Sequence, residues 1–437
     1  MLKKEFNKKL FKAIESSTTS YNAVSYIKKI LDDCNYNELK ENEKWNIKSG
    51  KFYVIRNDAS IVAFELPGEI KDIFSIVTTH CDTPSLLLKP NGEYIKDGYL
   101  KLNIMPYGGL LNYGWLDQPL SIAGRIIYKE NNKLKVKIID LEDTELVVPS
   151  VAIHQNDQAN SNLDLNMQID LQPLVGLSKS KEDWNKYLCK KCKVNNIIDY
   201  DLHLYNSSKP KLFGINKEFL LSPRIDNITS VYSALESFVS SKSKSIKVFC
   251  SFNNEEIGSL TEEGADSNFL IDILKRICAS INIDIAVALS KSFIISSDNT
   301  HAIHPNHKEY ADDTGALYLG KGLAIIKEIS STTNSISSSI IKEICDINKI
   351  KYQDATSKND LSTGSTLSGI SLRHLSVLSV DIGVPQLAMH SSIEVCSIDD
   401  VYEIYKLMKS FYEADILIDG SSIRINRSRK SKSNAEK

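Results

Sequence analysis

The feature that most constrains this chain is a set of five short segments, each carrying side chains able to hold a divalent metal. Each segment follows or lies beside an apolar run of strand length. The segments are residues 79–82, 222–227, 253–259, 297–298 and 389–391. Together they supply two histidines, three carboxylates and one spare glutamate. That set of side chains is typical of a two-metal hydrolase.

Length and composition set the frame for this chemistry. The 437 residues suffice for about two or three domains with a sizeable core. The net charge of −2 implies no affinity for nucleic acid or for a membrane surface. Neither a signal peptide nor an apolar stretch of membrane-spanning length is recognisable. The eight scattered cysteines suit reduced thiols, so we expect a cytoplasmic protein.

Alternating helical and strand patterns predict an α/β fold with a mixed, mostly parallel sheet covered by helices on both faces. We expect buried strands at residues 73–77, 248–252 and 283–289, and helices at residues 23–31 and 227–239. In such sheets ligands collect at the carboxyl ends of the strands. The candidate metal ligands lie at those ends, which supports them independently of residue type.

The character of the chain changes after Pro90. From there to about Pro210 it reads as β-rich, with strands expected at residues 120–128, 134–139 and 146–148. We therefore predict a discontinuous catalytic domain and an inserted β-rich domain for oligomerisation or as a lid. Their expected bounds are residues 1–90 and 213–437 for the catalytic domain and 91–212 for the insertion.

Four other stretches lead to further expectations. A final helix opens at Ser397 with a capping pattern, and the serine-rich residues 330–339 read as a loop and a helix start. The basic tail at residues 421–437 reads as a solvated, disordered end. We expect no zinc site at the isolated pair of Cys189 and Cys192, because neither a second cysteine pair nor nearby histidines accompany it in the sequence.

Two metals about 3.5–4 Å apart need a bridging carboxylate and further ligands on each side. Asp226 is the natural bridge, because it stands at a turn just before a helix. We expect His80 and Asp298 to hold one metal, and Glu256 and His390 to hold the other.

Two more carboxylates have expected roles beside these ligands. Glu255 and Glu256 are adjacent, so their side chains diverge, and Glu255 is then free to transfer protons as the catalytic base. Asp82, also a catalytic candidate, lies two residues from His80 on the same side of the strand end. It is placed to hold the ring nitrogen that faces away from the metal.

The chain resembles the M18 family of metalloaminopeptidases, the group of aspartyl aminopeptidase and vacuolar aminopeptidase I. The matching stretches follow the family's order from the first helix to about residue 396. They are residues 80–84, 107–109, 115–117, 120–125, 152–154, 222–227, 254–259, 297–306, 359–360, 364–366 and 383–391.

The resemblance implies a zinc-peptidase-like catalytic domain, two Zn²⁺ per subunit and removal of the N-terminal residue from peptides. It also implies a homo-oligomer of twelve subunits with internal active sites. His154 and His301 match positions near the substrate, and His154 is expected to reach a neighbouring subunit's site. Because histidine is the commonest metal ligand in proteins, His154 also stays a candidate metal ligand. Met389 and Lys327 complete the substrate-binding candidates.

Substrate preference and reaction class stay open at this stage. Lys327 lies close to the stretch whose lysine pairs with an acidic substrate side chain in the family, so acidic and neutral N-terminal residues are both candidates. Co²⁺ or Mn²⁺ could replace Zn²⁺ at carboxylate-rich sites. One alternative is an amidase or deacylase acting on non-peptide substrates on the same scaffold. Another is a catalytically silent assembly protein.

Overall fold

The structure, a computed structural model, describes residues 1–361, 367–419 and 422–427. A nine-stranded sheet lies at its centre, and its neighbours from β13 to β18 are parallel. In sheet order the strands are β1 (Asn37–Glu38), β2 (Gly50–Arg56), β3 (Ser60–Leu66), β13 (Ser245–Phe252), β4 (Lys71–His80), β14 (Phe293–Ser297), β18 (Leu378–Gly383), β16 (Leu323–Ile326) and β17 (Tyr352–Ala355). The carboxyl ends of four strands therefore meet at one edge.

Helices cover both faces of this sheet. One face packs against α1 (Lys3–Ser16), α2 (Ser20–Asp33), α4 (Ile225–Ser240), α7 (Ser335–Asn348) and α9 (Ile398–Glu413). The other face packs against α5 (Phe269–Ile281), α6 (Ile285–Ser290) and α8 (Leu367–Ser371). Successive strand residues point to opposite faces, so Ile61 and Ala63 join the first core while Val62 and Phe64 join the second. The predicted fold class is confirmed.

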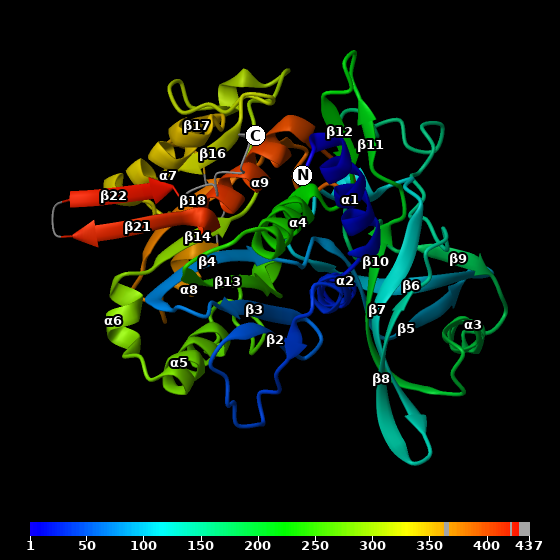
Figure 1. The fold of residues 1–437 in the computed structure, drawn as a ribbon. Coiled ribbons are helices and arrows are strands. Elements are labelled where there is room, and N and C mark those ends of the chain that lie inside the picture. Colours follow the sequence, from blue (N-terminus) through cyan, green and yellow to red (C-terminus); the bar gives the residue numbers. More distant parts are fainter. Residues whose placement is uncertain (362–366, 420–421, 428–437) are drawn as a thin grey trace, which may run out of the picture.

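A second, antiparallel sheet of six strands forms a separate lobe with its own core (Figure 1). Its strands are β8 (Lys133–Asp140), β7 (Leu120–Glu130), β10 (Ile197–Asn206), β5 (Ser85–Lys96), β6 (Tyr99–Tyr107) and β9 (Leu174–Leu177). The helix α3 (Glu182–Cys192) packs Trp184 and Leu188 into this core. The sheet starts a few residues before the expected boundary at residue 91, and the division into two domains stays a prediction.

A third, smaller sheet has five strands. It consists of β11 (Lys211–Phe213), β12 (Phe219–Ser222), β20 (Glu394–Ser397), β19 (Pro385–Leu387) and β15 (Thr300–His301). The remaining elements are η1 (Asn112–Trp115), η2 (Glu255–Ile257), η3 (Lys308–Tyr310) and the hairpin of β21 (Ala414–Asp419) and β22 (Ser422–Arg427). The small sheet matters for the site because β12 leads to Asp226 and β19 leads to His390.

Several local expectations are confirmed. The predicted helix at residues 23–31 lies within α2, and residues 330–339 form a loop that starts α7, where Asn334 accepts hydrogen bonds from the first helical amides. Ser397 caps α9 by accepting a hydrogen bond from the amide of Asp399. The described helices include none that is long and apolar enough to cross a membrane.

Three expectations are wrong. Residues 283–289 contain no strand, because Asp284 accepts hydrogen bonds from the amides of Ala286 and Val287 and so starts α6. Residues 146–148 make only isolated bridges to neighbouring strands. Within the tail, residues 422–427 pair with β21 as β22, while residues 421 and 428–437 lie outside the described part of the chain, as does the motif at 364–366.

Candidate metal centre

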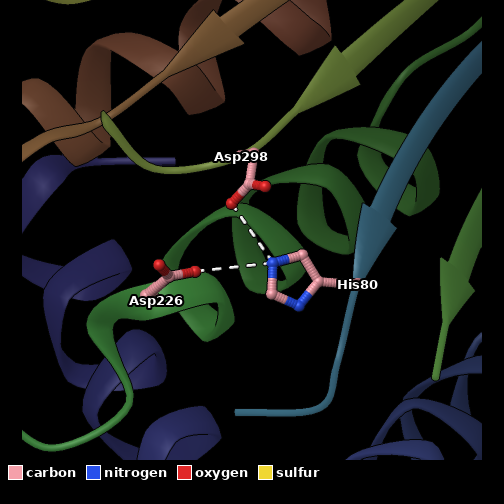
Figure 2. Close-up of side chains that lie close together, drawn as sticks. All are labelled: His80, Asp226 and Asp298. Atoms are coloured by element: carbon pink, nitrogen blue, oxygen red, sulfur yellow. Dashed lines mark hydrogen bonds and ion pairs between the residues drawn. The ribbon is translucent and has the colours of Figure 1, made fainter. Parts of the chain in front are cut away.

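The first cluster of candidate ligands consists of His80, Asp226 and Asp298. His80 is the last residue of β4 and Asp298 follows β14, and these two strands are parallel neighbours. Nε2 of His80 lies 3.2 Å from Oδ1 of Asp298 and 3.4 Å from Oδ1 of Asp226 (Figure 2). Adjacent parallel strands end at the same edge, which brings together two residues far apart in the sequence.

The second cluster consists of Asp226, Glu256 and His390. Nε2 of His390 lies 3.4 Å from Oε2 of Glu256 and 3.7 Å from Oδ2 of Asp226. The other ring nitrogen of His390 lies 2.7 Å from the carbonyl oxygen of Gly109, which orients Nε2 toward the carboxylates. Glu256 is delivered by η2, directly after β13.

Asp226 belongs to both clusters, and its two oxygens divide between them. Oδ1 faces His80, and Oδ2 faces His390. The residue is 4% exposed and stands at the start of α4 with a non-helical ψ of 114°. That backbone turns the side chain out of the helix and toward the strand ends. This is the arrangement that a bridging carboxylate requires.

The side chains fit divalent cations. In each cluster one candidate ligand atom per residue lies within 4.8 Å of the others. Oδ1 of Asp226 and Oε1 of Glu256 are buried and accept no hydrogen bond from the residues that the structure describes. Buried carboxylate oxygens without donors are costly unless a cation compensates them. Two imidazoles and several carboxylates are donors that zinc accepts.

The electrostatics of the crowded carboxylates point the same way. Burial, and then the charge of Asp226, raise the pKa of Glu256 well above its ordinary value. Burial would lower the pKa of His80, but the charge of Asp298 and a contact with Asp226 raise it well above its ordinary value. Without a cation, protons must neutralise the group of carboxylates. A bound divalent ion would take over that task.

Glu255 lies beside the ligands without belonging to either of these clusters. An oxygen of Glu255 lies within 4.8 Å of ligand atoms of His80 and Glu256. Burial raises the pKa of Glu255 to about 8; the charge of His80 opposes the shift, and those of Asp298, Asp82 and Asp226 add to it. A carboxyl group with a pKa near neutrality is suited to both accepting and donating a proton.

Asp82 holds three parts of the site together. Its carbonyl oxygen lies 3.1 Å and its Oδ1 3.4 Å from Nδ1 of His80, the ring nitrogen that faces away from the first cluster. Its Oδ2 accepts hydrogen bonds from the hydroxyl of Tyr107 at 2.8 Å and from the amide of Glu256 at 3.1 Å. Residues 107–109 are one of the stretches that match the family, but the contact of Tyr107 with Asp82 was not predicted, because it crosses from the six-stranded sheet.

The four remaining candidates are not members of the clusters. His154 stands on an exposed turn of the six-stranded lobe and belongs to none of the clusters found among the described residues. His301 lines a cavity of about 400 Å³ next to the site. Met389 precedes His390 and is half-buried, while Lys327 is exposed and is not among the described residues that line this cavity.

Sequence reasoning missed two groups that hold the ligands. One is the carbonyl of Gly109, described above, and the other is the buried carboxylate of Glu394. Glu394 accepts hydrogen bonds from the amides of Asp226 and His390. The signal that could have found it is an acidic residue directly before Val395 and Cys396, four residues after a candidate ligand.

Comparisons with known proteins show to which family the chain belongs. The model of the family "Aminopeptidase I zinc metalloprotease (M18)" matches residues 13–412. The probable M18 family aminopeptidase 2 of Clostridium novyi is 42% identical over 426 residues, covering 93% of this chain and 98% of the relative.

Two solved structures extend the comparison. The Ape4 chain from a complex with Nbr1 superposes with a TM-score of 0.90 at 29% identity, covering 94% of this chain and 86% of that one. The mApe1 dodecamer of S. cerevisiae has a TM-score of 0.82 at 24% identity, with coverage of 93% and 95%. The chain therefore belongs to the M18 family of zinc metalloaminopeptidases.

Proposed function

We propose that this chain is a two-zinc aminopeptidase that hydrolyses the N-terminal residue from peptides. The observation that carries the proposal is the division of the two Asp226 oxygens between His80 and His390, with Glu255 beside them. His80 and Asp298 would hold the first ion, Glu256 and His390 would hold the second, and Asp226 would hold both. Co²⁺ or Mn²⁺ would also suit these ligands.

The residues around the ions have separate tasks. When bound, two divalent ions polarise a scissile carbonyl and make water nucleophilic at neutral pH. Glu255 takes a proton from the attacking water and passes it to the leaving amine. Asp82 keeps the His80 ring oriented through Nδ1, and the Gly109 carbonyl does the same for His390.

The cavity beside His301 is where the N-terminal side chain of the substrate would bind. Its apolar lining includes Leu317, Leu361 and Leu387, and Glu328 also belongs to the lining. Lys358, a further lining residue, is paired with Asp360 at 3.1 Å. Of the two substrate classes predicted from the sequence, the leucines of this lining favour a neutral residue over an acidic one, because a buried substrate carboxylate would lose its hydration against apolar side chains.

The active form is proposed to be a dodecamer in the cytoplasm. The mApe1 relative is described as a dodecamer, and the resemblance implies the same assembly here, with His154 reaching the site of a neighbouring subunit. The eight cysteines form no disulfide, which suits a reducing compartment.

The test is a rate profile on matched peptides that begin with Asp, Glu, Leu or Met, each with a free and with an acetylated amine. We expect cleavage of the free peptides, faster for Leu and Met, loss of activity with a chelator and recovery with zinc. Cleavage confined to the acetylated series would favour the amidase or deacylase reading. No cleavage in either series by a metal-loaded protein would favour the silent assembly protein.

A further inference from the structure

Glu394 is a buried carboxylate that touches the backbone of two candidate ligands but is not itself a ligand. It opens β20 and is 2% exposed. Its Oε2 accepts a hydrogen bond from the amide of Asp226 at 3.1 Å, and its Oε1 accepts one from the amide of His390 at 2.9 Å. One side chain therefore links the helix start that carries Asp226 to the loop that carries His390.

The contacts of Glu394 continue as a buried polar chain. Its Oε1 also accepts a hydrogen bond from Nε2 of Gln386 at 3.1 Å, and Oε1 of Gln386 accepts one from Nδ2 of Asn299 at 2.5 Å. The amide of Asn299 donates to Oδ1 of Asp298 at 2.7 Å. The chain thus starts at the second cluster and ends beside a ligand of the first.

The two clusters differ in what holds their ligands. In the first cluster, His80 stands on β4 and is paired with Phe252 of β13. The amide of Asp298 donates a hydrogen bond to the carbonyl of Ile382 at 3.0 Å. The hydrogen bonds of the central sheet therefore hold both residues. In the second cluster, His390 has a φ of 65°, a conformation that side-chain-bearing residues rarely adopt. Such a backbone persists only where its surroundings hold it. Glu394 supplies the hydrogen bond at that amide.

Glu394 is not available to coordinate an ion itself. Both of its oxygens already accept from N–H donors, and it joins none of the ligand clusters among the described residues. The three N–H groups that donate to it supply hydrogen bonds to both oxygens of the carboxylate. An amide in its place would turn an NH₂ group toward at least one of these N–H donors, so the two backbones could not both keep their contact.

We propose that Glu394 is a positioning residue that sets the spacing of Asp226 and His390 and thereby the metal affinity of the second cluster. The inference rests on the proposed two-metal function. Removal of a partner that orients a ligand typically weakens metal binding by about 10- to 100-fold. We expect a loss of that size at the second cluster and a smaller one at the first, because the sheet holds His80 and Asp298 without Glu394.

The experiment compares Glu394→Gln with Asp400→Asn in the full chain. Asp400 is a matched control, because it is also a fully buried carboxylate that accepts from two backbone amides, those of Gly320 and Gly322 at 2.7 and 2.8 Å. Metal-free protein is titrated with Co²⁺, followed by calorimetry, by the visible spectrum and by metal content. Glu394→Gln should bind the second ion about 10- to 100-fold more weakly than the parent and the first ion with a clearly smaller loss. Asp400→Asn should bind both normally.

The outcomes separate the possible failures. A Glu394→Gln protein that binds both ions with parental affinity overturns the proposal, even if its melting temperature falls as that of the control does. An equal loss of affinity for both ions overturns the proposal as well. If the parent chain itself binds fewer than two ions, the proposed function fails first. Glu394→Asp, which withdraws the carboxylate by one methylene, provides a second test if the glutamine variant does not fold, with the same loss expected.

Discussion

At the scale of single residues, the site depends on which carboxylate moves protons and which ones hold metal. Glu255 and Glu256 are neighbours in the chain, yet Glu256 faces His390 while Glu255 lies near His80. The short η2 turn separates their directions. Their roles can therefore be tested by substitutions that leave the other glutamate in place.

Glu255→Gln should keep both metals and lose roughly 100-fold or more in kcat, because the amide fills the same space but cannot accept the proton of the attacking water. Metal content and steady-state rates on one neutral N-terminal substrate provide the measurement. Glu262→Gln, an exchange in the following loop at a residue outside the clusters, is the control. Retained activity with full metal occupancy would assign the base to another residue.

Metal binding should compete with protons at His80. Its pKa in the metal-free protein is raised above the value of about 6.5 expected in the unfolded chain, so its ion pairs stabilise the metal-free fold fully below that value. This contribution disappears as pH rises through the raised pKa. A metal ion needs the neutral ring, so zinc affinity should fall as pH falls, by up to about tenfold per pH unit for each proton displaced.

The measurement is a zinc titration in weakly buffered solution between pH 6 and pH 8 with a pH indicator. Protons should be released on binding, and activity should decline as pH drops through about 6.5 or lower. An affinity that does not change with pH, without proton release, would contradict a protonated His80 in the metal-free protein.

At the scale of elements, the candidate metal centre is assembled from three sheets: the central sheet, the small five-stranded sheet and the six-stranded sheet. The six-stranded sheet contributes Tyr107 and the loop at Gly108 and Gly109, which lie against Asp82, Glu256 and His390. A substitution in this loop should therefore shift candidate ligands that belong to other elements.

Gly108→Ala should destabilise the chain and weaken metal binding at the second cluster. Gly108 has a φ of 78°, where an alanine costs roughly 1–2 kcal/mol, and its new methyl would lie 3.1 Å from Cβ of Glu256. Gly98→Ala is the matched control, since Gly98 has a φ of 83° and no atom within 4 Å of the added methyl. The temperature of thermal unfolding should fall for both variants, whereas the metal content should fall only for Gly108→Ala. Equal metal content in both would show that the contact with Glu256 is unimportant.

The element scale also shows why one strand prediction failed. Residues 283–289 form a short apolar run, and periodicity cannot separate a buried strand from a helix over such a length. Asp284 decides the outcome, because its side chain accepts hydrogen bonds from two amides of the first helical turn. The strand that leads to Asp298 is instead β14, which starts at Phe293.

At the scale of the whole molecule, the loop that carries His154 leaves large apolar side chains in solvent. Val151, Ile153, Leu163 and Ile169 are 58%, 47%, 51% and 68% exposed, and they line a cavity of about 700 Å³. Exposed apolar patches of this kind mark contact surfaces between proteins. They are compatible with the proposed assembly, in which His154 would serve a neighbouring subunit.

Co-assembly of two inactive variants should restore activity. In a mixed particle of Glu255→Gln and His154→Ala chains, about a quarter of the sites would combine an intact Glu255 with an intact neighbouring His154 if the chains mix at random. The particles are co-expressed with two tags, purified through both and assayed beside each variant alone. No recovered activity would place His154 in the site of its own chain. A monomer with full activity in light scattering would contradict the assembly itself.

The sequence by itself determined which side chains are candidates for metal chemistry, because the side-chain types that bind metal stand at the ends of strand-length apolar runs, and both features are local. His80, Asp226, Glu256, Asp298 and His390 could be selected in this way, and so could the α/β fold class. Only the tertiary structure decided which oxygen of Asp226 faces which histidine and that Glu394 holds two of these backbones. The acidic residue at the start of β20 could have suggested Glu394, but its partners are backbone amides, which nearly every residue carries, so the sequence could not show which two amides it binds.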